Sequence, residues 1–147
     1  MADGQYRRLD AGTITLAHLG EVAAAVGDRN LLDELYRRML AYDGQTVIVI
    51  PSTYCNGAVA RYLGLFASGL GLYDEAEQHF HDALAMNERM NAKPWIARTQ
   101  IDYARMLLIK GDPADRDRAI QLRDAGLQTA RELGMPTVVA RATALLS

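Results

Sequence analysis

Hydrophobic residues recur along most of this chain with the three-to-four-residue period of amphipathic helices, and glycines interrupt that period at regular places. After each of these glycines come a polar turn and a new periodic segment, which is the pattern of a helix, a glycine stop and a second helix. The repeated signal is a small residue and a glycine seven positions later: Gly20 and Gly27, Gly64 and Gly71, Ala104 and Gly111. The pattern therefore predicts a helical hairpin that repeats along the chain.

The periodic segments predict seven helices, which form three hairpins and the first helix of a fourth. Their ranges are 12–26, 29–42, 57–70, 73–91, 95–110, 114–133 and 137–146. A single domain of residues 1–147 then contains hairpins 12–42, 57–91 and 95–133 and a partial fourth over 137–147. The last helix has an apolar face without a successor, whereas a terminal repeat normally carries a polar cap. We therefore expect the chain to be part of a longer protein or to pair with another copy.

One segment departs from the helical period. The run TVIVI at 46–50 is rich in β-branched residues and is bounded by Gly44 and Pro51, which suits a strand or an extended plug. As a strand, its edge would recruit another chain by strand addition. As a plug, it would be a loop pinned to the core, and the sequence leaves both alternatives open.

The middle hairpin has the spacing of small and aromatic residues that is typical of tetratricopeptide repeats. Small residues at 64 and 76 let two antiparallel helices approach closely, and the aromatic residue at 80 fills the gap to the next hairpin. The spacing between units is irregular, roughly forty residues rather than the thirty-four of the ideal repeat, and Gly126 stands where the middle unit has Ala83. The residues at the repeat offsets are Leu63, Gly64, Gly71, Tyr73, Ala76, Phe80 and Ala83.

The stretch VARYLGLFASGLGLYDEAEQHFHDALAMNERM, with the segments that follow it, resembles the C-terminal tetratricopeptide region of large bacterial signalling proteins. These are LuxR-type ATP-binding transcriptional regulators and cyclase proteins in which an ATPase module precedes the repeats. The resemblance covers residues 12–147 and implies an all-α, right-handed solenoid of about three and a half repeats. It also implies a module for protein–protein interaction or ligand sensing. No catalytic residues carry over, because the phosphate-binding string G-x-x-x-x-G-K-[ST] is absent.

Composition narrows the choice of partner. The 147 residues are 50% hydrophobic and 23% charged with a formal net charge of -2, so a basic stripe for direct nucleic-acid binding is not expected. No apolar run approaches the length of a membrane span, so no membrane partner is expected. The single cysteine, Cys55, favours a reducing cytoplasm over a secreted scaffold.

Catalytic and metal chemistry is not expected. His79 and His81 lie about 200° apart on a helix and cannot share a metal ion on one face. A reactive Cys55 would need a nearby histidine or a helix N-terminus to lower the pKa of its thiol, and a lone cysteine is more often a small buried hydrophobe. We expect no enzyme, no cofactor and no metal site.

The candidate site is the concave surface that the first helix of each hairpin lines. Three arginines would face one groove, and guanidinium groups bind carboxylates and phosphates bidentately. The repeat offsets place eight residues there: His18, Glu21, Arg61, Leu65, Ser68, Arg98, Asp102 and Arg105. We expect this groove to take a protein or peptide partner or a small anionic ligand.

Two alternatives stand beside this hypothesis. In the first, the arginines pair with Glu21, Asp102 and the acidic helices opposite and only make the surface soluble. In the second, the chain is a platform for homo-oligomerisation, a homodimer in the simplest case, formed through the uncapped C-terminal helix or through the segment 46–50.

Overall fold

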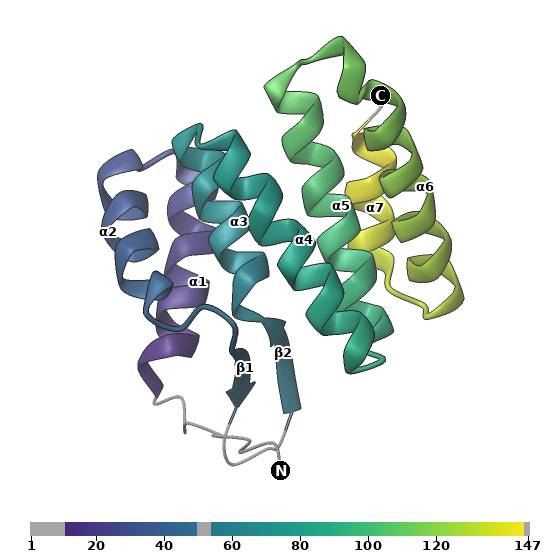
Figure 1. Ribbon diagram of the computed structural model, residues 1–147. Coiled ribbons are helices and arrows are strands. Elements are labelled where there is room, and N and C mark those ends of the chain that lie inside the picture. The colour runs from purple at the N-terminus through teal and green to yellow at the C-terminus, as the bar shows by residue number, and fades with distance from the viewer. Residues whose placement is uncertain (1–10, 50–53, 146–147) are drawn as a thin grey trace.

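The computed structural model describes residues 11–49 and 54–145, which form seven α-helices and one β-hairpin (Figure 1). The predicted all-α class and all seven predicted helices are confirmed, with helix ends that differ from the predicted ones by at most two residues. The helices are α1 (Ala11–Val26), α2 (Arg29–Leu40), α3 (Val59–Leu70), α4 (Tyr73–Arg89), α5 (Lys93–Lys110), α6 (Arg116–Glu132) and α7 (Pro136–Ala144). A short 3₁₀ turn, η1 (Pro113–Asp115), precedes α6.

The helices pack as successive hairpins. Consecutive helices α1 and α2, α3 and α4, and α5 and α6 contact each other, and each even-numbered helix also contacts the odd-numbered helix that follows it. The odd-numbered helices form a row of their own, because α3 contacts α1 and α5, and α5 contacts α7. Figure 1 shows α1 and α7 at opposite ends of this row.

All three predicted glycine stops have the backbone conformation that ends a helix, and Gly27 after α1 has a φ of 76°. Gly71 and Gly111 follow α3 and α5 with φ of 79° and 72°, in the left-handed region. A side chain at either position would strain the backbone, whereas glycine adopts this conformation without cost in sterics. The local sequence therefore determines where these helices end.

Large side chains packed against glycines bring neighbouring helices close together. Gly20 of α1 lies under the buried ring of Phe66 of α3, and a Cβ atom at that glycine would overlap the ring. Gly64 of α3 lies under Phe80 of α4, where a Cβ atom would be 2.8 Å from the Cε1 atom of the ring. The Phe80 ring also stacks on Tyr103 of α5 at a centroid distance of 5.4 Å, which agrees with its predicted place between two hairpins.

The glycine at position 126 belongs to the same packing scheme. A Cβ atom on Gly126 of α6 would lie 2.8 Å from Cδ1 of Ile101 and 3.0 Å from the carbonyl oxygen of Ala97, both on α5. The sequence comparison between repeats treats this glycine as a departure from the ideal unit. In the structure it is what allows α5 and α6 to approach each other.

The segment that departs from the helical period forms a strand over its described residues. Strand β1 (Thr46–Val49) pairs antiparallel with β2 (Tyr54–Ala58), and this hairpin also contacts α1, α4 and α5. Residue 50 of the predicted run lies outside the described residues. The strand alternative is therefore confirmed for 46–49, and α3 begins two residues later than predicted because Gly57, with φ of 82°, belongs to β2.

A buried histidine joins the second and fourth helices. The Tyr36 hydroxyl of α2 and Nε2 of His79 of α4 are 3.0 Å apart, and His79 is 8% exposed. Burial lowers the pKa of His79, although the negative charges of nearby carboxylates act in the opposite direction. His81, two residues later, is exposed and lies against Tyr103, so the two histidines face different surroundings as predicted.

We expect Gly20→Ala to destabilise the fold by about 1–3 kcal/mol, although alanine favours a helix by about 1 kcal/mol over glycine. The physical reason is the overlap with the Phe66 ring. Urea denaturation measures the loss. In the double variant Gly20→Ala/Phe66→Leu the smaller side chain should restore part of it, and strictly additive effects of the two substitutions would contradict the packing argument.

Stability should fall on acidification because of His79. Its pKa in the folded chain lies below the ordinary value of 6.5, so the unfolded chain binds a proton where the folded chain does not. The stabilisation is complete above the unfolded-state pKa of about 6.5 and is lost as the pH falls below it toward the lower pKa of the folded chain. Thermal denaturation across this range should show a weaker pH dependence for His79→Gln than for the natural sequence, and an unchanged dependence would contradict the role of His79.

Candidate functional site

Four charged side chains form a line of ion pairs along the row of odd-numbered helices, which we name the ionic ladder. Arg61 of α3 donates from Nε to Oδ2 of Asp102 of α5 at 2.8 Å and from Nη1 to Oε1 of Glu21 of α1 at 3.3 Å. Arg141 of α7 donates from Nη2 to Oδ1 of Asp102 at 2.6 Å. Acidic and basic groups alternate from α1 to α7, so the formal charges of the ladder cancel.

The centre of the ladder is buried. The side chains of Arg61 and Asp102 are 2% and 0% exposed. Burial by itself lowers the pKa of Arg61, but the charge of Asp102, followed by smaller contributions, outweighs this effect and raises the pKa above its ordinary value. The guanidinium group also lies 5.1 Å from the ring centroid of Tyr62 and 5.8 Å from that of Trp95, so aromatic faces cover it.

Arg61 is therefore not a residue of an open groove. Its donors are directed to Asp102 and Glu21, as in the alternative in which the arginines pair within the protein. The sequence offsets identify the correct side of α3 for this arginine. They do not reveal that α1, α5 and the two aromatic rings close over it.

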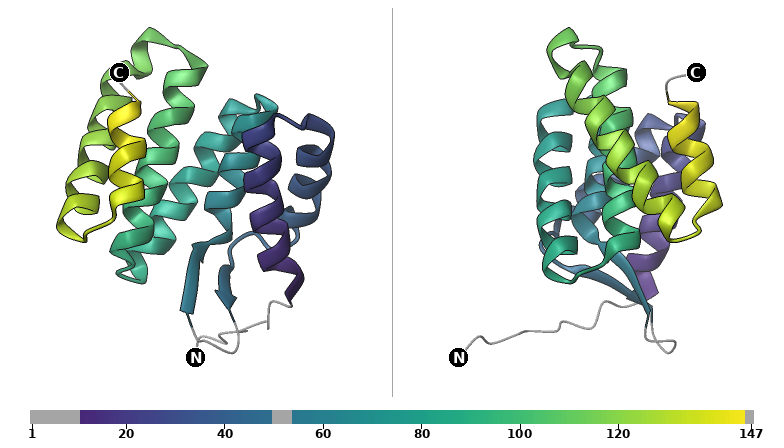
Figure 2. Two further views of the ribbon diagram at one scale, coloured as in Figure 1. Left: turned by 180° about the vertical axis from the view of Figure 1, so that it is seen from behind. Right: turned by 90° about the vertical axis from the view of Figure 1, so that its right-hand side faces the viewer.

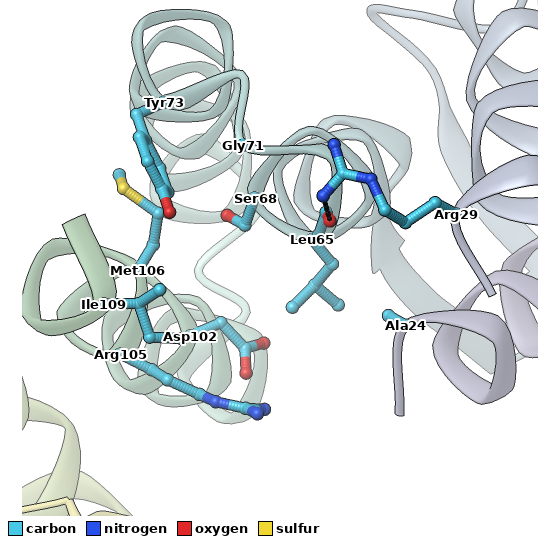
Figure 3. Close-up of a pocket in the computed structure, with 11 residues that line it drawn as sticks. Ala24, Arg29, Leu65, Ser68, Gly71, Tyr73, Asp102, Arg105, Met106 and Ile109 are labelled. Atoms are coloured by element: carbon cyan, nitrogen blue, oxygen red, sulfur yellow. Dashed lines mark hydrogen bonds between the residues drawn. The ribbon is translucent and has the colours of Figure 1, made fainter. Parts of the chain in front are cut away.

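A pocket of about 280 Å³ lies next to the ladder, between α1, the start of α2, α3, α4 and α5 (Figure 3). Four of the eight predicted groove residues line it: Leu65, Ser68, Asp102 and Arg105. Residues that the sequence analysis did not select complete the lining, among them Arg29, Tyr73, Met106 and Ile109. The structure thus brings half of the predicted set to one pocket.

The polar groups of the pocket differ in what they already bind. Arg29 donates from Nη2 to the carbonyl oxygen of Leu70 at 2.7 Å, at the C-terminal end of α3. The Ser68 hydroxyl donates to the carbonyl oxygen of Gly64 at 2.7 Å. Arg105 is exposed, and Figure 3 shows its side chain extending from α5 in the same direction as that of Asp102. Arg29 and Arg105 are therefore the two cations that line this pocket; backbone carbonyl oxygens hold Arg29, whereas Arg105 has no such bond within the described residues.

The remaining predicted residues lie elsewhere. His18 is exposed on α1, and Arg98 stacks over Trp95 with its Cζ atom 5.2 Å from the ring centroid. Trp95 itself is half-buried against Gly57, where a Cβ atom would lie 2.8 Å from Cδ2 of the indole. Neither His18 nor Arg98 lines the pocket, so the predicted groove separates into the pocket, the ladder and these two outlying residues.

A second polar cluster joins α4, α5 and α6. The hydroxyl of Tyr103 donates to Oε1 of Glu77 at 2.9 Å, and Nη1 of Arg118 donates to the same oxygen at 2.5 Å. Burial and the hydrogen bond to Glu77 raise the pKa of Tyr103, whereas hydrogen bonds from Arg118 and Tyr103 outweigh burial and lower the pKa of Glu77. The sequence analysis missed this cluster, because its members lie on three helices with no shared local spacing.

Arg29 was also missed. It lies in the first turn of α2, whereas the repeat offsets were applied only to the first helix of each hairpin. Its place in the pocket depends on its bonds to carbonyl oxygens at the end of α3, about forty residues further along the chain. A local pattern carries no signal for such a contact.

Within 11–49 and 54–145, no three histidine, cysteine, aspartate or glutamate residues are grouped so that they could hold a metal ion. In the same part of the chain, no helix combines the length and apolarity needed to cross a membrane. The side chain of Cys55 lies outside the described residues, so its predicted burial stays a prediction. Comparison of the chain with family models, curated proteins and solved structures found no match.

Removing the charge of Asp102 should lower the stability of the fold far more than removing the charge of Arg141. Asp102→Asn leaves Arg61 buried with only the longer contact to Glu21, and we expect a loss of about 3–5 kcal/mol in the free energy of unfolding. Arg141→Met leaves the buried pair intact and should cost about 1 kcal/mol or less, since this side chain is 38% exposed. Urea denaturation compares the two, and equal losses would mean that the buried pair is not the centre of the ladder.

Proposed function

We propose that this chain is a binding module rather than an enzyme, and that the pocket around Arg105 takes an anionic group of its ligand. The proposed architecture is a tetratricopeptide-like, right-handed solenoid of about three and a half repeats. The successive helical hairpins and the row of odd-numbered helices support this architecture. In such stacks neighbouring repeats bury the faces between them, and an extended concave surface is left for partners.

The observation that carries the proposal is that the charges of the ladder are paired with one another, whereas the charge of Arg105 is not. Asp102 also lines the pocket, but Arg61 and Arg141 already bind its two oxygens. Arg105 forms no ion pair within the described part of the chain, and its side chain is exposed at the pocket. The pocket therefore has a positive charge available for a ligand, and a guanidinium group binds carboxylates and phosphates well.

The rest of the lining determines which anions are suitable. Leu65, Met106 and Ile109 provide apolar surface, and the ring of Tyr73 lies at another side (Figure 3). A volume of about 280 Å³ suits one amino-acid side chain or a small molecule. The proposed ligand is thus an acidic peptide segment or a small anion with an apolar group beside its charge.

In its biological setting, we propose, this module serves a bacterial signalling or transcriptional regulator of the LuxR-like kind and works in the cytoplasm. The resemblance of the repeats to those proteins and the single cysteine support this setting. A ligand that binds one arrangement of the hairpins better than another would shift the population between them. An attached output domain would respond to that shift.

The test is direct binding with two kinds of probe. A fluorescein-labelled peptide of alternating glutamate and leucine is titrated in fluorescence anisotropy, and citrate, benzoate and inorganic phosphate are tested by thermal shift. We expect one probe class to bind and Arg105→Glu to weaken it by tenfold or more, about the value of one charge-assisted hydrogen bond. The matched variant Arg98→Glu changes an arginine of the same helix outside the pocket and should leave binding within about twofold.

Binding of the labelled peptide would indicate a peptide ligand, and binding of citrate, benzoate or phosphate would indicate a small anion. Binding that survives Arg105→Glu, or that Arg98→Glu weakens just as strongly, would contradict the assignment of the pocket. Lack of binding by every probe would contradict the proposed ligand chemistry. Urea denaturation of each variant serves as the folding control.

A further inference from the structure

The outer face of α1 is largely apolar, with the exposed His18 beside its apolar side chains. The helix has one charged residue, Glu21, and that residue pairs with Arg61 in the ladder. Leu19, Val22 and Val26 are nevertheless 45%, 58% and 71% exposed. Exposed apolar side chains that lie together on one surface mark a site of interaction. The left view of Figure 2 shows α1 in front, with no described element over it.

The exposed positions of α1 have the spacing of a helix–helix seam. Thr15, Leu19, Val22 and Val26 follow one another at intervals of four, three and four residues along one stripe. This alternation is the spacing by which two helices pack side by side. We refer to these four residues as the α1 ridge.

The other end of the row has an uncovered groove. It lies between α6 and α7, has a volume of about 410 Å³ and is lined by small and apolar residues, including Ala130, Gly134, Met135, Val139 and Ala140. The exposed residues of α7 within the described chain are proline, threonine and alanine, and its charged residue Arg141 is bonded to Asp102 in the ladder. We refer to this feature as the α6/α7 groove.

Contacts inside the chain show how such a ridge and groove combine. The Phe66 ring lies against Gly20 where α3 packs on α1, and Ile101 lies against Gly126 where α6 packs on α5. In each case a large side chain of one helix fills the space over a small residue of the next. The α1 ridge offers large side chains and the α6/α7 groove offers small residues, so the two are complementary in the same way.

From these observations we infer that a second copy of this chain covers the α1 ridge, and that the ridge of one copy inserts into the α6/α7 groove of the next. The row of odd-numbered helices then continues from α7 of one copy to α1 of the other, as it continues within the chain from α5 to α7. The charges do not oppose the contact, because the α1 ridge has no charged residue and Arg131 is the one charged residue that lines the groove. A shared interface of this kind buries no like charges against each other.

This head-to-tail contact has a different consequence from a two-fold dimer. Each copy presents one ridge and one groove, so every added copy leaves a ridge and a groove uncovered at the two ends. Growth is limited by concentration and not by closure at two subunits. The contact is independent of the proposed ligand pocket, since no residue of the α1 ridge lines that pocket.

The experiment uses one variant for each surface. Val22→Glu places a charge on the ridge, Ala140→Glu places one in the groove, and Gln121→Glu places the same charge on an exposed part of α6 outside the groove. Light scattering coupled to size-exclusion chromatography measures the mass over about a hundredfold range of concentration. The natural sequence and Gln121→Glu should grow beyond two copies, and each of the other two variants should be monomeric.

The decisive sample is an equal mixture of Val22→Glu and Ala140→Glu. The first variant retains its groove and the second retains its ridge, so the mixture should form one contact and stop at two chains. Self-association of Ala140→Glu alone would overturn the inference, because the ridge would then pair with another ridge. A natural sequence that is monomeric at every concentration, or a mixture that stays monomeric while each variant is folded by circular dichroism, would also overturn it. Val26→Glu is the second ridge variant if Val22→Glu does not fold, since Val26 is 71% exposed.

Discussion

The buried ion pair between Arg61 and Asp102 is the constraint on which the arrangement of the hairpins depends. Two charges are tolerated in an apolar interior only while each has its partner, so α3 and α5 must keep the register that brings these side chains together. Glu21 and Arg141 extend the same requirement to α1 and α7. Close packing such as that of Phe66 on Gly20 sets how near the helices lie, and the buried charges add a directional requirement to it.

The same pair determines what the pocket presents to a ligand. Asp102 and Arg105 are three residues apart on α5 and therefore point to one side of it. Because Arg61 and Arg141 balance the carboxylate, the guanidinium groups of Arg29 and Arg105 make the pocket positive. One turn of one helix thus contributes both a charge that holds the fold and a charge that is available for binding.

Much of the fold could be predicted because its signals are local. Apolar residues at helical spacing, together with glycines such as Gly71 and Gly111 that adopt a left-handed conformation, mark the helices and their ends. The strand at 46–49 was left open beside a plug, since a short β-branched run does not reveal its pairing partner. The sequence does not reveal the role of Gly126 for a related reason, because the need for a small residue there comes from Ile101 on another helix.

By itself the sequence determined the all-α class, the seven helices, their order and most of their ends, because backbone periodicity and glycine conformation act within a few residues. It also placed Arg61 and Arg105 on the same side of the hairpins. Only the tertiary structure decided that Arg61 is sealed against Asp102 while Arg105 stays exposed at a pocket. The physical reason is that burial depends on what the neighbouring helices place over a side chain, and those neighbours lie about forty residues away in the chain.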